Sequence, residues 1–376
     1  MAKNTSSSEQ KQVQSAAASS GKQSSKEIQK TGSSRIAELE AELKKTDYNK
    51  RTQYHIGLVK AKIAALKEKE VARSSQGPKG LGYAVRKSGD ATVVLLGFPS
   101  AGKSSLLNAI TLANSPVGAY EFTTLNVVPG ILEYKSAKIQ ILDVPGILAG
   151  AASGKGRGRE VLAVLQSADL VVIVVDTLRP TVYKVILHEV YDSHLRLNAK
   201  KPDVKIKKTS KGGIRIGSTL RLHHLTNEMI QSICKEMHIS NADIVIRSDI
   251  TVDEFIDAIE GNKRYISALT VLTKSDLVSE EELVRIRKEV SADICISTTT
   301  GSGISELKEL IYQKLRLIRV YCKEVSKKAD LTVPLIIFQG ATIQDLCTKL
   351  HRDFVTKFAF AKVWGKSAKF PGQGPS

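Results

Sequence analysis

One short stretch constrains the fold of this chain more than any other. Residues Gly97–Ser104 read Gly-Phe-Pro-Ser-Ala-Gly-Lys-Ser and match the pattern Gly-x-x-x-x-Gly-Lys-Ser/Thr completely. An aliphatic run, Thr92–Leu96, precedes the match, and a helical pattern over Ser105–Leu112 follows it. Such glycines let the backbone wrap a phosphate, so that amide groups and a helix N-terminus face the anion. The sequence therefore predicts a phosphate-binding loop between a strand and a helix.

Within this loop, the side chains can be given separate tasks. Lys103 is expected to reach the β- and γ-phosphates, and the hydroxyl of Ser104 to bind Mg²⁺. A tight glycine turn with a surface lysine is the alternative, but a chance match with these flanks is rare. The full set of expected nucleotide contacts in the loop is Gly97, Pro99, Ser100, Ala101, Gly102, Lys103, Ser104 and Ser105.

Further aliphatic runs alternate with helical stretches after residue 91. Continuous runs of Val, Ile and Leu suit strands that are buried on both faces of a mainly parallel sheet. We therefore predict an α/β fold in which a P-loop domain is built on such a sheet. The later runs are Ile139–Leu142, Leu170–Val175, Leu269–Leu272 and Ile294–Ile296.

Two segments between the first strands have the residues of a phosphate-dependent switch. Asp143, at the end of a predicted strand, is expected to help hold Mg²⁺, and Gly146 can turn its backbone toward a γ-phosphate. A Thr hydroxyl in Tyr120–Leu125 can complete the Mg²⁺ shell only while a γ-phosphate is present. Thr124 is favoured over Thr123 for this role, and a Thr-rich β-segment is the alternative.

The choice of base is predicted from the segment after the strand Leu269–Leu272. Asp276 can accept two N–H groups from the guanine edge, whereas adenine lacks that pair and would leave a buried carboxylate unpaired. The stem of Lys274 can lie over the ring. Asp276 also opposes the alternative of a P-loop ATPase. The expected contacts near the base are Thr273, Lys274, Asp276 and Leu277, with Ser297 and Thr298 after the last core strand.

With these motifs in order, the chain resembles the developmentally regulated GTP-binding proteins, within the Obg-like GTPases of translation. The resemblance runs from about Arg35 to Trp364. It implies binding and hydrolysis of GTP, GDP as the product, Mg²⁺ as cofactor, and a C-terminal TGS domain of the β-grasp type. The carrying segments are Gly97–Ser104, Tyr120–Leu125, Asp143–Gly146, Ile147–Arg159, Leu178–Pro180, Tyr48–Lys50 and Ala361–Gly365.

The sequence departs from related GTPases at two positions of the nucleotide site. Thr273 stands where many small GTPases have Asn, so one hydrogen bond that braces the loop in those enzymes is left open for this chain, although the guanine-reading Asp276 is kept. Ser100 stands where Obg relatives often have an Asn that is associated with a potassium ion. Potassium stimulation is therefore left open for this chain.

The charge of the chain bears on its partners. It has 376 residues, and Lys and Arg number 56 against 38 acids, which gives a net charge of +18. A protein this basic usually meets a polyanion, and we expect the ribosome or RNA rather than DNA, although the excess charge can also serve solubility alone.

Four widely spaced cysteines exclude a disulfide scaffold and a Cys-rich zinc module. No apolar run is long enough for a membrane span, and we expect a cytoplasmic protein.

The expected domains follow from composition and spacing. Asp143 and Asp276 lie too far apart for one strand–helix–strand passage, so an α+β subdomain is expected between them. In it, Val204–Lys207 and Ile214–Ile216 alternate apolar and basic residues around Gly212-Gly213, which predicts a hairpin with one basic face. The expected boundaries are a disordered tail at 1–34, a basic helical hairpin at 35–73, a linker at 74–90, a GTPase domain at 91–318 with the insert at 180–262, and a TGS-like domain, shorter than usual, at 319–376.

Together these features predict a GTP-hydrolysing switch that associates with ribosomes or RNA in translation. The alternative is a nucleotide-regulated scaffold or assembly protein in which hydrolysis is incidental. A regulatory partner protein of the kind that accompanies this family is also expected from the resemblance.

The catalytic assistance generates a prediction. Ile147 stands where Ras-like enzymes place a water-orienting Gln, so intrinsic hydrolysis should be slow. Our hypothesis is that Arg157 or Arg159, or Lys155 beside them, neutralises transition-state charge in cis, or that a partner completes the site. We expect Arg157→Ala or Arg159→Ala to lower single-turnover GTP hydrolysis while the affinity for GTP holds. Unchanged turnover in Arg157→Ala, in Arg159→Ala and in Lys155→Ala would eliminate the cis version.

Overall fold

The computed structural model describes residues 34–47, 49, 52–74, 88–111, 128–144, 164–323, 327, 329, 331–365, 370, 372 and 374. These residues form two compact units, which we describe separately. One unit contains the described residues up to 74 together with 200–263. The other contains residues 88–199 and the chain from residue 264 onward.

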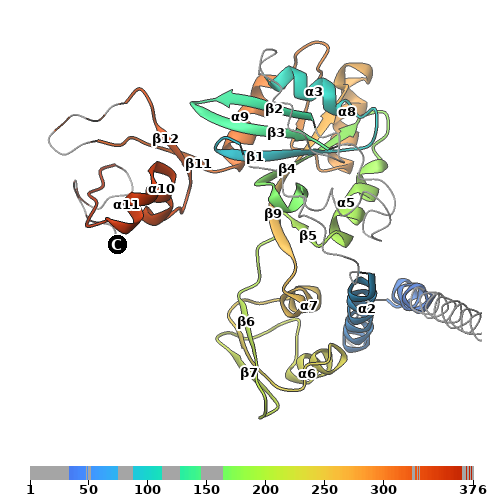
Figure 1. Ribbon diagram of the computed structural model, residues 1–376. Coiled ribbons are helices and arrows are strands. Elements are labelled where there is room, and N and C mark those ends of the chain that lie inside the picture. Colours follow the sequence, from blue (N-terminus) through green and yellow to red (C-terminus); the bar gives the residue numbers. More distant parts are fainter. Residues whose placement is uncertain are drawn as a thin grey trace, which may run out of the picture. The chain divides into compact units, whose positions relative to one another are not determined.

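A mainly parallel sheet is the centre of the second unit (Figure 1). In the described residues its path runs β10-β9-β4-β1-β3-β2, with β5 paired to β9. Only β2 is antiparallel to its neighbour. The strands are β1 (Ala91–Leu96), β2 (Val128–Tyr134), β3 (Ala137–Asp143), β4 (Leu170–Asp176), β5 (Leu195–Leu197), β9 (Arg264–Thr273) and β10 (Ile294–Cys295).

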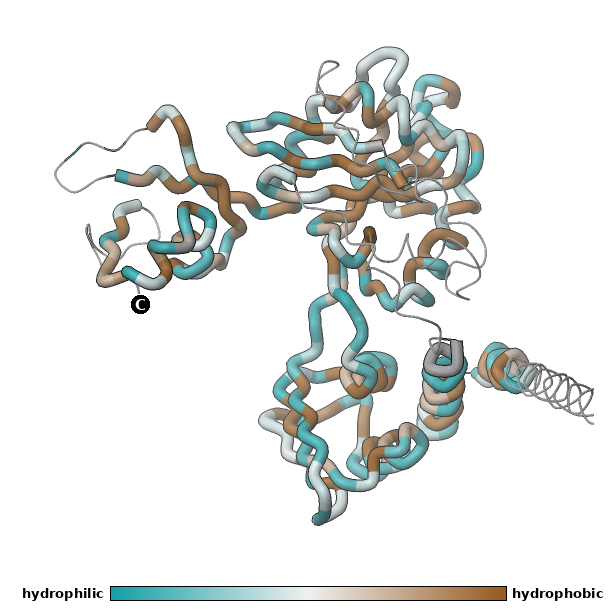
Figure 2. Tube along the Cα trace, viewed as in Figure 1, coloured by the Kyte–Doolittle hydropathy of each residue, from teal (hydrophilic) through white to brown (hydrophobic). Residues whose placement is uncertain are grey.

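Helices cover both faces of this sheet, which explains why the strands are apolar throughout. α3 (Lys103–Ile110) and α9 (Ile304–Lys314) pack on one face, and α5 (Val182–Asp192) and α8 (Glu280–Glu289) on the other. The brown colour in Figure 2 follows the strands between these layers. The predicted α/β fold is therefore confirmed, and the parallel pairing brings the ends of β1, β3, β4 and β9 to one edge.

The last described part of the chain begins with an antiparallel pair, β11 (Leu317–Val320) and β12 (Leu335–Phe338). Two helices follow, α10 (Ile343–Leu350) and α11 (Arg352–Thr356). Between them the backbone is extended at His351, with φ of −167°. The helix therefore ends at Leu350 and a new, short one begins after the break.

In the first unit, residues 200–263 form a three-stranded sheet and two helices. The strands β6 (Val204–Lys208), β7 (Ile214–Ser218) and β8 (Ala242–Ile246) are ordered β6-β8-β7. The predicted hairpin is wrong in its pairing, because β8 lies between β6 and β7. Both predicted strands exist, but β8 has the most strongly buried apolar face of the three and takes the central position. Helices α6 (Asn227–Glu236) and α7 (Val252–Glu260) cover that face.

The predicted N-terminal helical pair is present and belongs to this same unit. A helix over residues 34–45 packs against α2 (Gln53–Ser74), with Val59 and Ile63 buried between them. The opposite side of α2 carries small residues, and Ala61 there is fully buried against the core of α6 and α7. Lys60 forms an ion pair with Asp253 of α7 at 2.6 Å. The helical pair and the small sheet therefore share one core.

The boundary of the insert follows from strand pairing. The compact unit starts at residue 200 rather than at the expected residue 180. Helix α5 packs on the large sheet, and β5 pairs with the first residues of β9. The chain thus completes one more helix and one more strand of the large sheet before it enters the insert. Among the described helices, none is long and apolar enough to cross a membrane.

A polar cluster joins the β2–β3 turn to α9 and generates a prediction with a definite pH dependence. Glu309 accepts hydrogen bonds from Lys135 at 2.8 Å, from Tyr134 at 2.7 Å and from Gln313 at 2.8 Å. These donors, with Lys135 first, lower the pKa of Glu309 from its ordinary 4.5 to about 2. A carboxylate with a lowered pKa stabilises the fold above its unfolded-state pKa, and this contribution is lost as the pH falls toward its folded-state pKa.

We therefore expect Glu309→Gln to lower the free energy of unfolding at neutral pH, with a deficit that shrinks as the pH falls from about 4.5 toward about 2. Denaturant unfolding of both proteins across this range, at low and high salt, measures the effect. Glu306→Gln, one turn away on α9 and exposed, is the matched control and should lower the free energy of unfolding at neutral pH by less than Glu309→Gln does. A deficit for Glu309→Gln that is constant with pH would contradict the assignment.

Candidate functional site

The phosphate loop lies between β1 and α3, as the sequence predicted. A Cβ atom at Gly97 would approach the backbone oxygen of Val174 to 2.5 Å, so only glycine fits beside β4 at this point. Gly102 has a φ of +85° and Ser100 a φ of +63°, both in the left-handed region. The loop therefore contains left-handed residues, which glycine adopts without strain. Helix α3 begins directly after it, at Lys103.

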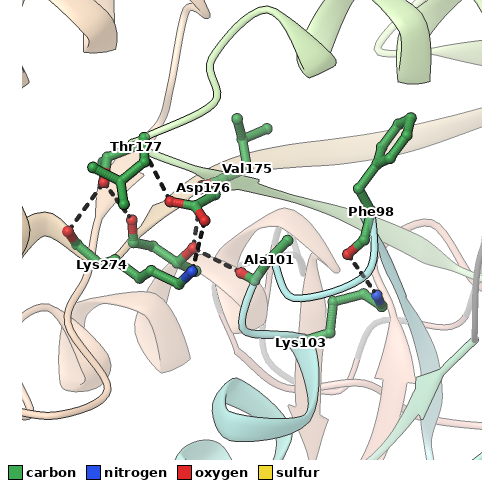
Figure 3. Close-up of polar contacts among 9 residues, drawn as sticks. Phe98, Ala101, Lys103, Val175, Asp176, Thr177 and Lys274 are labelled. Atoms are coloured by element: carbon green, nitrogen blue, oxygen red, sulfur yellow. Dashed lines mark hydrogen bonds and ion pairs between the residues drawn. The ribbon is translucent and has the colours of Figure 1, made fainter.

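Lys103 is buried inside this loop. Its ammonium group donates to the backbone oxygen of Phe98 at 3.0 Å (Figure 3). It also donates to the backbone oxygen of Gly97 at 3.0 Å. Burial lowers the pKa of Lys103, and the negative charge of Asp143 acts in the opposite direction. A desolvated cation beside a carboxylate is prepared to meet the negative charge of a phosphate.

Ser104 and Asp143 form a pair next to this lysine. The hydroxyl of Ser104 donates to Oδ2 of Asp143 at 2.8 Å. The other carboxylate oxygen, Oδ1, is buried and accepts no hydrogen bond from any described residue. A buried carboxylate oxygen without a partner, beside a hydroxyl, has the ligand chemistry that Mg²⁺ prefers. Ser104 and Asp143 therefore fit a magnesium ion that a bound phosphate would complete.

The segment after β9 lies directly against the phosphate loop. The hydroxyl of Thr273 donates to the backbone oxygens of Ala101 at 2.8 Å and of Val175 at 3.2 Å. Although Thr273 stands where many small GTPases have Asn, its hydroxyl still braces the phosphate loop. Lys274 follows with φ of +59°, and a short 3-10 helix, η1 (Ser275–Leu277), carries Asp276.

Asp276 and Leu277 are exposed in this short helix, while Ser297 is buried and Thr298 half-buried in the loop after β10. The two loops are joined by a hydrogen bond from the backbone N–H of Ser275 to the oxygen of Ile296. The structure thus brings the predicted base-reading segment and the predicted Ser297 loop side by side. In the phosphate loop, the predicted contacts Pro99, Ser104 and Ser105 are exposed.

Two residues at the end of β4, Asp176 and Thr177, belong to the same network, although no sequence motif predicted a role for them in the site. Asp176 forms an ion pair with Lys274 at 2.6 Å, and the hydroxyl of Thr177 contacts the backbone oxygens of Thr273 and Lys274 (Figure 3). In the sequence, only the position of Asp176 indicates this role. It ends a buried parallel strand at the same edge of the sheet as Asp143 and Thr273.

Four predicted catalytic or metal-binding residues lie outside the described residues: Thr124, Gly146, Arg157 and Arg159. The rest of Tyr120–Leu125 and of Ile147–Arg159, including Lys155, lies outside them as well. The described part of the site therefore consists of the phosphate loop, Asp143 and the loops that contain Asp276 and Ser297.

Comparison with known proteins gives the class to which this fold and site belong. Residues 92–208 match the family described as 50S ribosome-binding GTPase, residues 211–317 match the C-terminal region of that domain, and residues 318–370 match the TGS domain. Together with the parallel sheet and its phosphate loop, these matches define a P-loop GTPase with a C-terminal TGS domain.

Relatives along most of the chain define the family. The chain is 53% identical to an uncharacterized GTP-binding protein of Methanocaldococcus jannaschii over 342 residues, which is 90% of this chain and 87% of that protein. It is 44% identical to developmentally-regulated GTP-binding protein 1 of Xenopus laevis, with 89% of this chain and 92% of that protein covered. GTP-binding protein 1 of Schizosaccharomyces pombe is 42% identical, with 90% and 93% covered. The chain belongs to the developmentally regulated GTP-binding proteins, as the sequence resemblance predicted, and it is a GTP-binding, GTP-hydrolysing enzyme.

The contact between Thr273 and the phosphate loop yields a prediction. Thr273→Val keeps the shape of the side chain but leaves the backbone oxygen of Ala101 without this donor in a buried place. We expect the free energy of unfolding to fall by about 1–3 kcal/mol and the affinity for GDP to weaken. Denaturant unfolding and calorimetry with GDP measure the two effects. Thr273→Ser, which keeps the hydroxyl, should retain most of both, and equal losses in the two variants would show that the hydroxyl is not the cause.

Proposed function

We propose that this GTPase is a molecular switch that associates with the ribosome or its RNA during translation. The proposal is carried by one observation: the phosphate loop, Asp143 and the base-side loop meet at one edge of the sheet, in a chain whose net charge is +18. The first part of this observation supports a GTP-dependent switch. The second supports a polyanionic partner.

In the proposed site, phosphate binding depends on the loop and Lys103. Ser104 and Asp143 would hold Mg²⁺, whose role is to offset the charge of the phosphates, and Thr124 would join them in the GTP state. Loss of the γ-phosphate would release the contacts of Thr124 and Gly146, which is the switching event. Ile147 cannot orient the attacking water as Gln does in Ras-like enzymes, so Arg157 or Arg159, or Lys155 beside them, would neutralise the charge of the transition state, or a partner would complete the site.

The base would be read by Asp276, with Leu277, Ser297 and Thr298 around it and the stem of Lys274 over the ring. The position of Asp276 supports this, because its short helix directly follows Thr273, which contacts the phosphate loop. A nucleotide with its phosphates in the loop would extend its base toward this segment.

Three observations support the ribosomal part of the proposal. The matching domain family is described as 50S ribosome-binding GTPase. The segment from residue 44 to 87 carries 12 basic and 3 acidic residues. In the insert, Lys205 and Lys207 of β6 and Arg215 of β7 are exposed, alternating with residues that pack on the core. We propose that these basic segments contact RNA phosphates, that the protein is cytoplasmic, and that the TGS domain binds a regulatory protein.

The base-reading role of Asp276 leads to a prediction about nucleotide choice. Asp276→Asn replaces one acceptor by a donor, which fits the 2-oxo group of xanthine instead of the 2-amino group of guanine. We expect the affinity for GDP to fall by about 100-fold or more and the affinity for xanthosine diphosphate to rise. Competition binding with GDP, ADP and xanthosine diphosphate measures this. Similar affinities of the variant and the unaltered protein for all three would remove Asp276 from the site.

The ribosomal role is tested by ribosome pelleting with GDP and with a non-hydrolysable GTP analogue. We expect more protein in the pellet with the analogue, and a loss of binding as salt rises, because basic residues release counterions from RNA. Combined Lys205→Gln and Lys207→Gln should weaken pelleting and reduce the salt dependence. Combined Arg285→Gln and Lys288→Gln removes the same charge from exposed positions of helix α8, outside the insert, and serves as the control. Binding without salt or nucleotide dependence, and no acceleration of GTP turnover by ribosomes, would favour a scaffold instead.

A further inference from the structure

Asp176, the last residue of β4, is held on both sides of its carboxylate. Oδ2 lies 2.6 Å from the ammonium nitrogen of Lys274, and Oδ1 accepts the backbone N–H of Leu178 at 3.0 Å. The side chain is only 12% exposed. The carboxylate is therefore fixed by its own turn, and it offers Lys274 a stationary partner with little competition from water.

Thr177 fastens the same segment through its backbone and its side chain. Its backbone N–H donates to the oxygen of Thr273 at 3.2 Å. Its hydroxyl, which is buried, lies 3.0 Å from the backbone oxygens of both Thr273 and Lys274. These carbonyls lie where the ladder between β4 and β9 ends, so Thr177 provides the donor that a further strand residue would have provided.

Lys274 needs such support because its backbone is in the left-handed region, with φ of +59° and ψ of +37°. A residue with a Cβ atom is strained there and stays there only when its surroundings hold it. Lys274 directly precedes the short helix that carries Asp276. Its conformation therefore sets the direction in which that helix leaves the sheet.

From this arrangement we infer that Asp176 and Thr177 are positioning residues for guanine recognition. They hold Lys274 in its left-handed conformation and thereby place the Asp276 carboxylate opposite the donors of the base, without touching the nucleotide themselves. The inference rests on the base-reading role proposed for Asp276. It adds that the selectivity of the site depends on two residues at the end of a neighbouring strand, β4.

The test compares GDP with inosine diphosphate, which lacks only the 2-amino group. Dissociation constants for both are measured by calorimetry for the unaltered protein and for Asp176→Asn. We expect GDP binding to weaken by about tenfold, and the preference for GDP over inosine diphosphate to narrow. A general loss of stability would weaken the binding of both nucleotides equally and would leave the ratio of their dissociation constants unchanged. A change in this ratio therefore distinguishes a loss of base recognition from a loss of stability.

Asp169→Asn is the matched control. Asp169 directly precedes β4, at the other end of that strand from Asp176, and accepts the backbone N–H of Thr92 at 2.9 Å. The control also replaces a carboxylate at a strand end, but it should leave the ratio unaltered. Thr177→Val removes the hydroxyl of the second residue and should reduce the preference for GDP over inosine diphosphate, as Asp176→Asn does. Thr177→Ser keeps the hydroxyl and should not reduce this preference. Because Asp176 acts through Lys274, its substitution should have little further effect in a Lys274→Met background.

The possible failures can be told apart. If the unaltered protein prefers GDP but Asp176→Asn and Thr177→Val keep the full preference, the inference is overturned and the role of Asp276 stands. If the unaltered protein binds GDP and inosine diphosphate equally, the base-reading role of Asp276 fails and the inference fails with it. Full additivity of Asp176→Asn with Lys274→Met would overturn the claim that Asp176 acts through Lys274.

Discussion

The parallel pairing of β1, β3, β4 and β9 decides where this molecule can perform chemistry. Parallel strands finish at the same edge of a sheet, so the residues that follow them become neighbours although they are far apart in sequence. Thr273 touches Ala101 and Val175, and Ser104 touches Asp143, because these strands are in register. The buried lysine and the left-handed residues of the loops can be tolerated there because the sheet fixes the ends of every loop.

This constraint also explains how much the sequence predicted. Strands that are covered on both faces must be apolar at every position, and runs such as Leu170–Val175 showed them clearly. The phosphate loop was equally clear, because backbone geometry forces glycine at Gly97 and favours it at Gly102. Thus the α/β fold, the family and the placement of the phosphate loop followed from local patterns.

The features that the sequence did not reveal depend on contacts between distant segments. Nothing local says that β8 separates β6 from β7, because strand order depends on which apolar face is best covered. The second face of α2 consists of small residues such as Gly57 and Ala61, which leave no hydrophobic periodicity although they pack closely. In the sequence, Asp176 and Thr177 resemble an ordinary turn. Their role depends on contacts with Lys274, which is far away in the sequence.

Strand pairing also explains how the sheet tolerates a large insert. β5, the last strand before the insert, pairs with Arg264–Ile266, the first residues after it. The two ends of the insert are therefore close together, and the entropic cost of closing so long a connection grows only slowly with its length.

β9 then continues without interruption to Thr273 and is paired with β4 along seven positions. A single strand thus connects the exit of the insert with the residues proposed to read the base. Its pairing with β4 resists any sliding between them, because a shift by one residue would exchange the two buried faces of the strand.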